Sequence, residues 1–412
     1  MRRTLPKAPI LLASLPLFLT ACGGTATSDA GSEASAEATP HGYIAGAQEN
    51  AEPQKGLFTL NRKNGEAQLM SLLDDETVDA GTFGAVNDVA QDGRYAFLTT
   101  GDAVEVFDTG AWTVEHGDHD HYYSAEPGSV GTIELPGAGT VAGDGKQVAV
   151  FSDSEGYASL YTHEDLDAGE ITEKGRITTT PHDGLVVPYQ DHFLASVPAD
   201  GTTATSAANG VEVRTADDET VLPAQSCPGL SSHAKTRVGV VFACTDGALL
   251  ITEDDGEFSA EHIPYPTENP TNNSAEPATA LEHRPGSNEL AGTAGDAGVW
   301  HLNVSDRRWT LLKTPVPAIS ASAVGDEQRV LAVGVDGSLL SLDPETGELL
   351  AQTALLEPAE EGNPPQLRID TSRAYVSDPA ASKVHEVDYA DNLRVARTFE
   401  VPAADLMLET GL

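Results

Sequence analysis

The sequence predicts an all-β protein, a β-propeller with four-stranded blades. Between residues 41 and 402 helical periodicity is almost absent, and short Val, Leu, Phe and Ala runs alternate with Gly, Asp, Asn and Pro. A phrase of apolar strand, polar turn and second strand recurs every ~35–50 residues, which is the spacing of propeller blades. Upstream of most copies a further strand–turn–strand run completes a four-stranded unit. The copies are GLFTLNRKNGEAQLM, AVEVFDTGAWTVE, ASLYTHEDLDAGEITE, GVEVRTADDETVLP, ALLITEDDGEFSAE, GVWHLNVSDRRWTLL, SLLSLDPETGELLAQ and KVHEVDYADNLRVARTF.

The repeat count predicts eight blades. Seven follow instead if EPQKGLFTLN and the C-terminal unit share one blade through closure of the ring. A closed ring also protects sheet edges that an open array leaves unpaired. A β-helix or a sandwich is the alternative, and the presence of four expected strands in each repeat argues against both. Residues 403–412 are predicted to form a C-terminal tail.

The N-terminus resembles the export signal of a bacterial lipoprotein. Three basic residues precede the apolar stretch APILLASLPLFL, which is too short to span a bilayer comfortably. The following LTAC is similar to a lipobox. We therefore expect residues 1–21 to be a signal peptide and Cys22 to be the acylated N-terminus. An ordinary secretory signal followed by a chance cysteine is the alternative. The first reading predicts an extracytoplasmic protein, anchored through lipid alone to the outer face of a bacterial cell membrane.

The segment 22–40 is small and polar, and it contains no large apolar residue, so we interpret it as a flexible tether. The propeller is expected to occupy residues 41–402. The formal net charge of the chain is -41, which makes nucleic acid and anionic lipid surfaces poor partners. This acidity attracts cations, although diffuse negative charge also serves solubility alone.

Two cysteines remain, Cys227 and Cys244, 17 residues apart across two expected strands. In an exported chain, two such cysteines most simply form one disulfide. Thiolate ligation of a metal is the alternative, and an oxidising compartment argues against it.

The most unusual segment is EHGDHDHYYSAEPG, residues 115–128, in the second blade. It lengthens a turn that is short in other blades, and such insertions often carry function. Imidazole and carboxylate ligands suit zinc better than calcium or magnesium. In an extended strand two residues separated by one point to the same side, and one turn of chain returns a third residue to them. A solvated polar loop is the alternative. The candidate ligands are His116, Asp118, His119 and His121, with Asp120 as a further carboxylate.

Two more histidines, His182 and His233, each open a blade just before its first strand. First strands line the central channel, so these side chains could approach each other at one mouth. Hydrogen-bonded structural roles are the alternative. His163 is expected in a turn, and His41 is an accessory candidate. The histidines at 192, 262, 283, 301 and 385 show no clustering and are interpreted as structural or exposed.

Catalytic motifs are absent from the sequence. It contains no G-x-S-x-G, no Walker A loop and no H-E-x-x-H. Its Gly-rich stretches are not followed by a strand–helix unit, so phosphate binding is not indicated. We therefore expect a protein that is not an enzyme.

Three phrases together, HGDHDHYY, PHDGLVVP…DHFLASVP and CPGLSSHA…VVFACTDGALLI, resemble the AztD family of zinc metallochaperones. The resemblance implies an extracytoplasmic propeller that binds Zn(II) and passes it to the solute-binding protein of a zinc ABC importer. We expect the protein to be a monomer. The implied ligands are the histidines and acid of the blade-two segment, then His182 and His233. The family phrase after Cys-Pro is expected to read Leu-His-Gly-Glu, whereas LSSHA stands here. His233 is thus displaced by about two residues and the adjacent acid is missing.

Two other functions remain open at this stage. One is a non-enzymatic surface propeller that binds a protein or a glycan, and the other is a propeller hydrolase or lyase with a catalytic metal. In simple propeller register, the blade-two insertion and the entry to a first strand also lie on opposite faces. The sequence therefore leaves open one metal site or two, and delivery of zinc or its storage.

Overall fold

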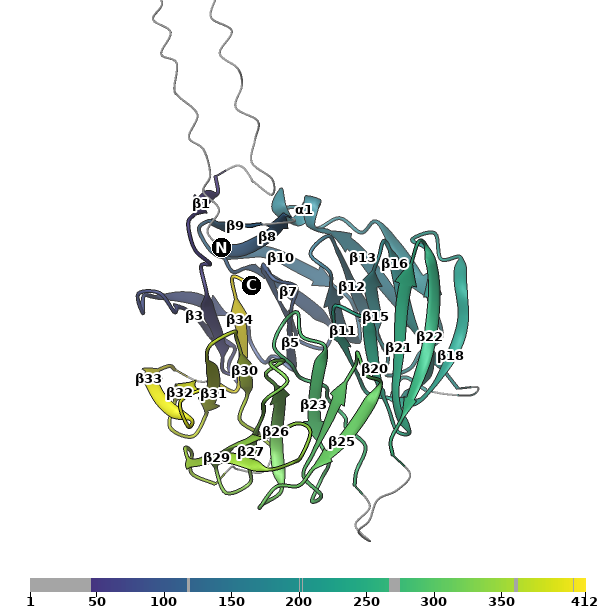
Figure 1. The fold of residues 1–412 in the computed structure, drawn as a ribbon. Helices are drawn as coiled ribbons and strands as arrows, with labels where there is room; N and C mark the ends of the chain where they lie inside the picture. The colour runs from purple at the N-terminus through teal and green to yellow at the C-terminus, as the bar shows by residue number, and fades with distance from the viewer. Residues whose placement is uncertain are drawn as a thin grey trace, which may run out of the picture. The chain divides into compact units, whose positions relative to one another are not determined.

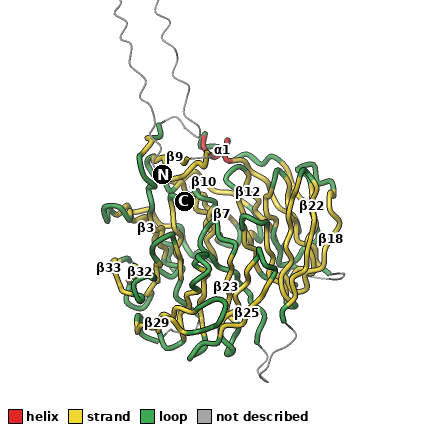
Figure 2. Tube along the Cα trace, viewed as in Figure 1, coloured by secondary structure: helices red, strands yellow, loops and turns green. Residues whose placement is uncertain are grey.

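The computed structural model describes residues 46–116, 119–199, 201, 203–266, 275–358, 362–402 and 404–412, with the side chain of His116 outside the description. They belong to a compact unit that runs from His41 to Leu412. Apart from one short helix, the regular elements of these described residues are strands, as Figures 1 and 2 show. Among the described residues no helix is long and apolar enough to cross a membrane.

Eight successive antiparallel sheets form the blades, which confirms the predicted all-β propeller and the count of eight. Each sheet runs from an inner to an outer strand because the turns are short and successive strands pair. Blade 1 consists of β34 (Leu406–Thr410), β2 (Gly56–Leu60), β3 (Glu66–Ser71) and β4 (Thr77–Thr82), and blade 2 of β5 (Asp88–Gln91), β6 (Tyr95–Thr99), β7 (Ala103–Asp108) and β10 (Gly128–Glu134). Blade 3 consists of β11 (Ala138–Gly143), β12 (Gln147–Ser152), β13 (Tyr157–Thr162) and β14 (Gly175–Thr178). Blade 4 consists of β15 (Val186–Tyr189), β16 (His192–Pro198), β17 (Ala208–Arg214) and β18 (Thr220–Leu230).

In blade 6 a short extended segment takes the inner position. The backbone of Glu282 exchanges two hydrogen bonds with Ala291 of that sheet, at 2.8 and 3.0 Å. Blade 5 consists of β19 (Ser232–Lys235), β20 (Val240–Cys244), β21 (Gly247–Asp254) and β22 (Glu257–Pro264), and blade 6 contains β23 (Glu289–Thr293), β24 (Val299–Asn303) and β25 (Arg308–Leu312). Blade 7 consists of β26 (Ala318–Ala323), β27 (Val330–Gly334), β28 (Ser338–Leu342) and β29 (Leu349–Ala354). Blade 8 consists of β30 (Leu367–Ile369), β31 (Ala374–Asp378), β32 (Lys383–Asp388) and β33 (Arg394–Glu400).

The core is divided among the interfaces between blades. Eight buried apolar clusters each join one sheet to the next, and the last joins blade 8 back to blade 1. Both faces of most second strands are therefore covered, and β2, β6 and β27, each the second strand of its blade, read as continuous buried runs. This chain of clusters closes the ring.

The chain end corrects the expected boundary of the propeller. Residues 403–412 were predicted to be a tail, but β34 is fully buried and pairs with β2 as the inner strand of blade 1. The C-terminal unit β30–β33 still forms a blade of its own, so ring closure leaves eight blades rather than seven.

A ninth, three-stranded sheet lies outside the ring of blades. It consists of β1 (Gln48–Asn50), β9 (His119–Ser124) and β8 (Ala111–His116), in the order β1-β9-β8. Figure 1 shows it near the helix α1 (His163–Asp167) at one end of the propeller.

Candidate metal centre

The histidine-rich segment is a β-hairpin rather than an irregular loop. It leaves blade 2 after β7 and returns at β10, and its register places His116 opposite His119. Gly110 turns the chain into it with φ +73°, where a Cβ would lie 2.5 Å from the Ala125 carbonyl oxygen. The predicted ligand Asp118 lies outside the described residues.

Alternation along β9 separates the histidines from one carboxylate. The rings of His119 and His121 lie 4.9 Å apart, and His121 stacks on Tyr123 at 6.2 Å. This confirms that the two histidines share a side of the strand. Asp120 alternates to the other side, where it is exposed opposite Glu115. Of the two predicted carboxylates, Asp120 therefore does not share the face of the histidines.

A carboxylate that sequence reasoning missed lies on this face. Glu49 belongs to β1, which pairs with β9 so that Glu49 stands opposite Tyr123. Its Oε1 is 2.7 Å from Nδ1 of His121. The two residues are 72 positions apart in a polar segment that carries no strand pattern, so no local signal could have joined them.

The base of the hairpin is anchored to the ring by Arg94. Its guanidinium lies 3.9 Å from the ring centre of Trp112, which stacks on the buried Tyr123 at 5.5 Å. The same guanidinium donates two hydrogen bonds to Asp108, at 3.0 and 2.5 Å, and one to Asp167 of α1, at 3.0 Å. Bidentate pairing and stacking hold Arg94 rigidly, so the hairpin has a firm base.

His163, expected in a turn, begins the helix α1 and pairs with a buried carboxylate. Its Nε2 is 2.5 Å from Oδ2 of Asp92. Burial alone would lower the pKa of His163, but the hydrogen bond and charge of Asp92, with Asp167 and Asp144 nearby, raise it. This pair lies on the same face as the hairpin, because α1 also follows the third strand of its blade.

His182 is fully buried, and both of its ring nitrogens have hydrogen-bond partners. Nδ1 lies 2.7 Å from the Thr180 carbonyl oxygen and Nε2 lies 2.7 Å from Oγ of Ser196, which accepts from the Leu185 N–H. Burial lowers the pKa of His182 and favours the neutral ring. Zinc ligation by His182 would have to replace one of these bonds.

His233 lies on β19, the inner strand of blade 5. Burial first, then the charges of Lys235 and His283, lower its pKa to about 4. His283, read from sequence as unclustered, lies beside this strand, with Nε2 2.9 Å from the Lys235 carbonyl oxygen. The histidine that accompanies His233 along the inner strands is thus His283 of the next blade.

The remaining histidines of the described residues have local partners, and the accessory candidate His41 lies outside those residues. His262 lies 3.0 Å from Asp246, His301 lies 3.5 Å from Glu289, and His192 lies 2.8 Å from the Gln190 carbonyl oxygen. His385 lies 3.1 Å from the Thr398 hydroxyl. Within the described part of the chain, no three His, Cys, Asp or Glu side chains form a metal-ready group. His182 and His233 are therefore not gathered with the described hairpin histidines.

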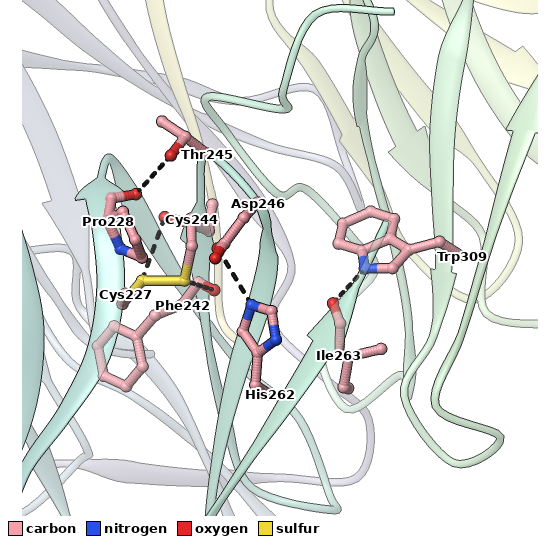
Figure 3. The surroundings of a disulfide bond; sticks show 10 residues. Cys227, Pro228, Phe242, Cys244, Thr245, Asp246, His262, Ile263 and Trp309 are labelled. Carbon is pink, nitrogen blue, oxygen red and sulfur yellow. Dashed lines mark hydrogen bonds and ion pairs between the residues drawn. A yellow bond between two sulfur atoms is a disulfide. The ribbon is translucent and has the colours of Figure 1, made fainter. Parts of the chain in front are cut away.

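The predicted disulfide between Cys227 and Cys244 is present, and Figure 3 shows its surroundings. It joins β18 of blade 4 to β20 of blade 5, rather than two strands of one hairpin. Both cysteines are buried in the cluster between these blades. The thiolate-ligand alternative is excluded here because both sulfur atoms are bonded.

The sequence and the fold of this chain are similar to those of known proteins. No protein-family model matches the chain. The zinc chaperone AztD of Citrobacter koseri is 24% identical over 313 residues, which cover 73% of this chain and 72% of that protein. The crystal structure of Citrobacter koseri AztD matches with a TM-score of 0.75 at 20% identity, over 87% of this chain and 98% of that chain. The chain is AztD-like. The structure of apo AztD from the same organism gives the same TM-score of 0.75 at 19% identity.

A third match concerns the fold alone. The dihydro-heme d1 dehydrogenase NirN has a TM-score of 0.55 at 12% identity, over 88% of this chain and 76% of that chain. The AztD-like match thus confirms the family resemblance seen in the sequence.

Proposed function

We propose that this AztD-like protein is an extracytoplasmic, lipid-anchored zinc chaperone. It binds Zn(II) through His116, His119 and His121 with Asp118, and it transfers the ion to the solute-binding protein of a zinc ABC importer. The observation that carries this proposal is the hairpin, whose register puts His116 opposite His119 while the rings of His119 and His121 lie 4.9 Å apart. The zinc chaperone name of the relative supports the choice of metal.

The site is suited to exchange rather than to permanent retention. Neutral imidazoles and a carboxylate can be replaced one at a time by ligands of a recipient, whereas a closed four-cysteine site resists this. The hairpin stands outside the ring of blades, with His119 exposed, so a partner can reach it. His182 and His233 remain candidates for a second site deeper in the ring.

A zinc titration against a chelating competitor tests the proposal. We expect stoichiometric binding by the wild type and loss of a site in His116/His119/His121→Ala. The His182/His233→Ala variant reports separately on the second candidate site. The matched control is His192/His262→Ala, which removes two histidines from blades 4 and 5 and is expected to leave binding unchanged. Ligand imidazoles must be neutral, so affinity should also fall as pH drops through roughly 6.5.

Two results would contradict this function. The first is absence of saturable zinc binding by the wild type at neutral pH, which would favour a surface propeller that binds a protein or glycan. The second is an affinity that stays the same in the triple histidine variant. Transfer is measured by mixing the zinc-loaded protein with the metal-free solute-binding protein in excess chelator, where direct hand-over leaves the chelator unloaded.

A further inference from the structure

The hydrogen bond between Glu49 and His121 bears on how the proposed site is prepared for zinc. Glu49 Oε1 lies 2.7 Å from Nδ1 of His121, and the side chain of His121 is 18% exposed. An ionised carboxylate only accepts hydrogen bonds, so Nδ1 must carry the proton in this contact. The other ring nitrogen, Nε2, is then the one whose lone pair can bind a metal.

We propose that Glu49 is a positioning residue for zinc binding: it holds His121 in the Nδ1–H tautomer and directs ligation to Nε2. This inference rests on the proposed function. Carboxylates that accept from the second nitrogen of a ligating histidine fix its ring and raise its basicity. Glu49 occupies that place relative to His121.

The surroundings restrict the ring from two further directions. Tyr123 stacks on His121 at 6.2 Å and is itself packed on Trp112, which rests on Arg94. On the opposite edge β1 is fixed to β9 by three paired positions and by a 3.0 Å hydrogen bond from Asn50 Nδ2 to the Ser124 hydroxyl. The carboxylate and the aromatic stack therefore hold His121 between them.

This arrangement gives β1 a function that its three residues do not suggest. The strand precedes the first blade strand β2 and adds nothing to the eight blade sheets. Its pairing with β9 instead places Glu49 beside the hairpin, so we call β1 the strap. Loss of the strap would leave the zinc ligands on the hairpin but remove control of the His121 tautomer.

The test is the imidazole ¹⁵N spectrum of the metal-free protein at pH 8, with the His121 signals assigned by their loss in His121→Gln. We expect the Nδ1–H tautomer in the wild type and a mixture in Glu49→Gln, because an amide both donates and accepts. Zinc affinity should fall about 10–100-fold in Glu49→Gln. The matched control is Glu52→Gln, an exposed glutamate of the same segment, which is expected to change neither quantity.

An unchanged His121 tautomer in Glu49→Gln would overturn the inference, whatever happens to zinc affinity. A changed tautomer in a protein that binds no zinc would defeat the proposed function, while the contact between Glu49 and His121 would stand. A changed tautomer with unchanged zinc affinity would refute the positioning role alone. The two proposals therefore fail separately.

Discussion

At the scale of single residues, the inner strand of blade 1 carries a buried acid. Glu409 lies on β34 and is 2% exposed, and its Oε1 has no hydrogen-bond partner among the described residues. Burial, and then the charge of Asp370, raises the pKa of Glu409 to about 8. The folded protein therefore holds a proton there that the unfolded chain, with an ordinary value of 4.5, releases earlier.

This difference predicts a stability that depends on pH. The contribution of neutral Glu409 is fully present below pH 4.5 and is lost as pH rises through about 8. We expect Glu409→Gln to be more stable than the wild type at pH 9, by on the order of 3–5 kcal/mol, and to lose this advantage towards pH 4.5. Urea denaturation across this range measures the difference.

The matched control is Glu289→Gln, which has the opposite sign. Burial alone would raise the pKa of Glu289, but the contact with His301 at 3.5 Å and the hydrogen bond from the Glu327 N–H lower it. The charged form of Glu289 therefore stabilises the fold above pH 4.5, and its amide variant should be less stable at pH 9. A Glu409→Gln variant that is no more stable than the wild type at pH 9 would refute the assignment.

At the scale of elements, the hairpin depends on one guanidinium. Arg94 lies in the turn between β5 and β6, yet it contacts Trp112 on β8, Asp108 on β7 and Asp167 in α1. Its side chain is 8% exposed, so removal leaves carboxylates without their partner in a poorly hydrated place. The insertion is thus held by the blade from which it departs.

We expect Arg94→Ala to lower the free energy of unfolding by about 3 kcal/mol, as for other broken buried ion pairs. Hydrogen exchange in β8 and β9 should rise with it. The matched control is Arg176→Ala, because Arg176 also lies over an aromatic ring, 4.2 Å from the centre of Tyr157, and pairs with Glu173. Arg176 is 50% exposed, so its loss should cost less than about 1 kcal/mol. Equal effects of the two substitutions would contradict the anchoring role.

At the scale of the whole molecule, eight similar interfaces hold the ring, and one of them is covalent. Cys227 and Cys244 connect blades 4 and 5, and their sequence separation is 17. The other interfaces are held by non-covalent contacts, mainly apolar packing, so a break at any of them would open the ring. Because of the disulfide, the ring cannot begin to open at the interface between blades 4 and 5.

We expect Cys227→Ala/Cys244→Ala to lower the free energy of unfolding by about 3 kcal/mol, the value for a loop of ~15 residues. Hydrogen exchange should increase in β18 and β20 before it increases in β27 and β31. The control is Cys22→Ala, which removes the remaining cysteine and should leave the denaturation midpoint unchanged. A double variant as stable as the wild type would show that packing alone closes this interface.

Much of the fold could be predicted from the sequence because each blade repeats strands and turns that are adjacent in the chain. The closing strand could not, since LMLET at 406–410 pairs with Gly56–Leu60 at the other end of the chain. No local pattern records that partner. The three-residue strand β1 was missed for the same reason.

The candidate site was predictable in part. The spacing of His119 and His121 on an extended strand placed both rings on one side, as found. Composition alone could not tell that Asp120 alternates away, that Glu49 arrives from a distant strand, or that His283 accompanies Lys235. These facts depend on the register of paired strands and on contacts between neighbouring blades, and neither can be derived from a single sequence.

The position of β34 at the chain end has a consequence for biosynthesis. Blade 1 lacks its inner strand until residues 406–410 have been synthesised, so the ring cannot close before then. The contacts of the hairpin also depend on the chain end, because the N–H and hydroxyl of Thr113 donate to the carbonyl oxygens of Leu412 and Gly411, each at 3.2 Å. A chain truncated before residue 406 would therefore present a hairpin without its contacts to Gly411 and Leu412. The closing of blade 1 and the final contacts of the hairpin therefore depend on the same short segment, residues 406–412.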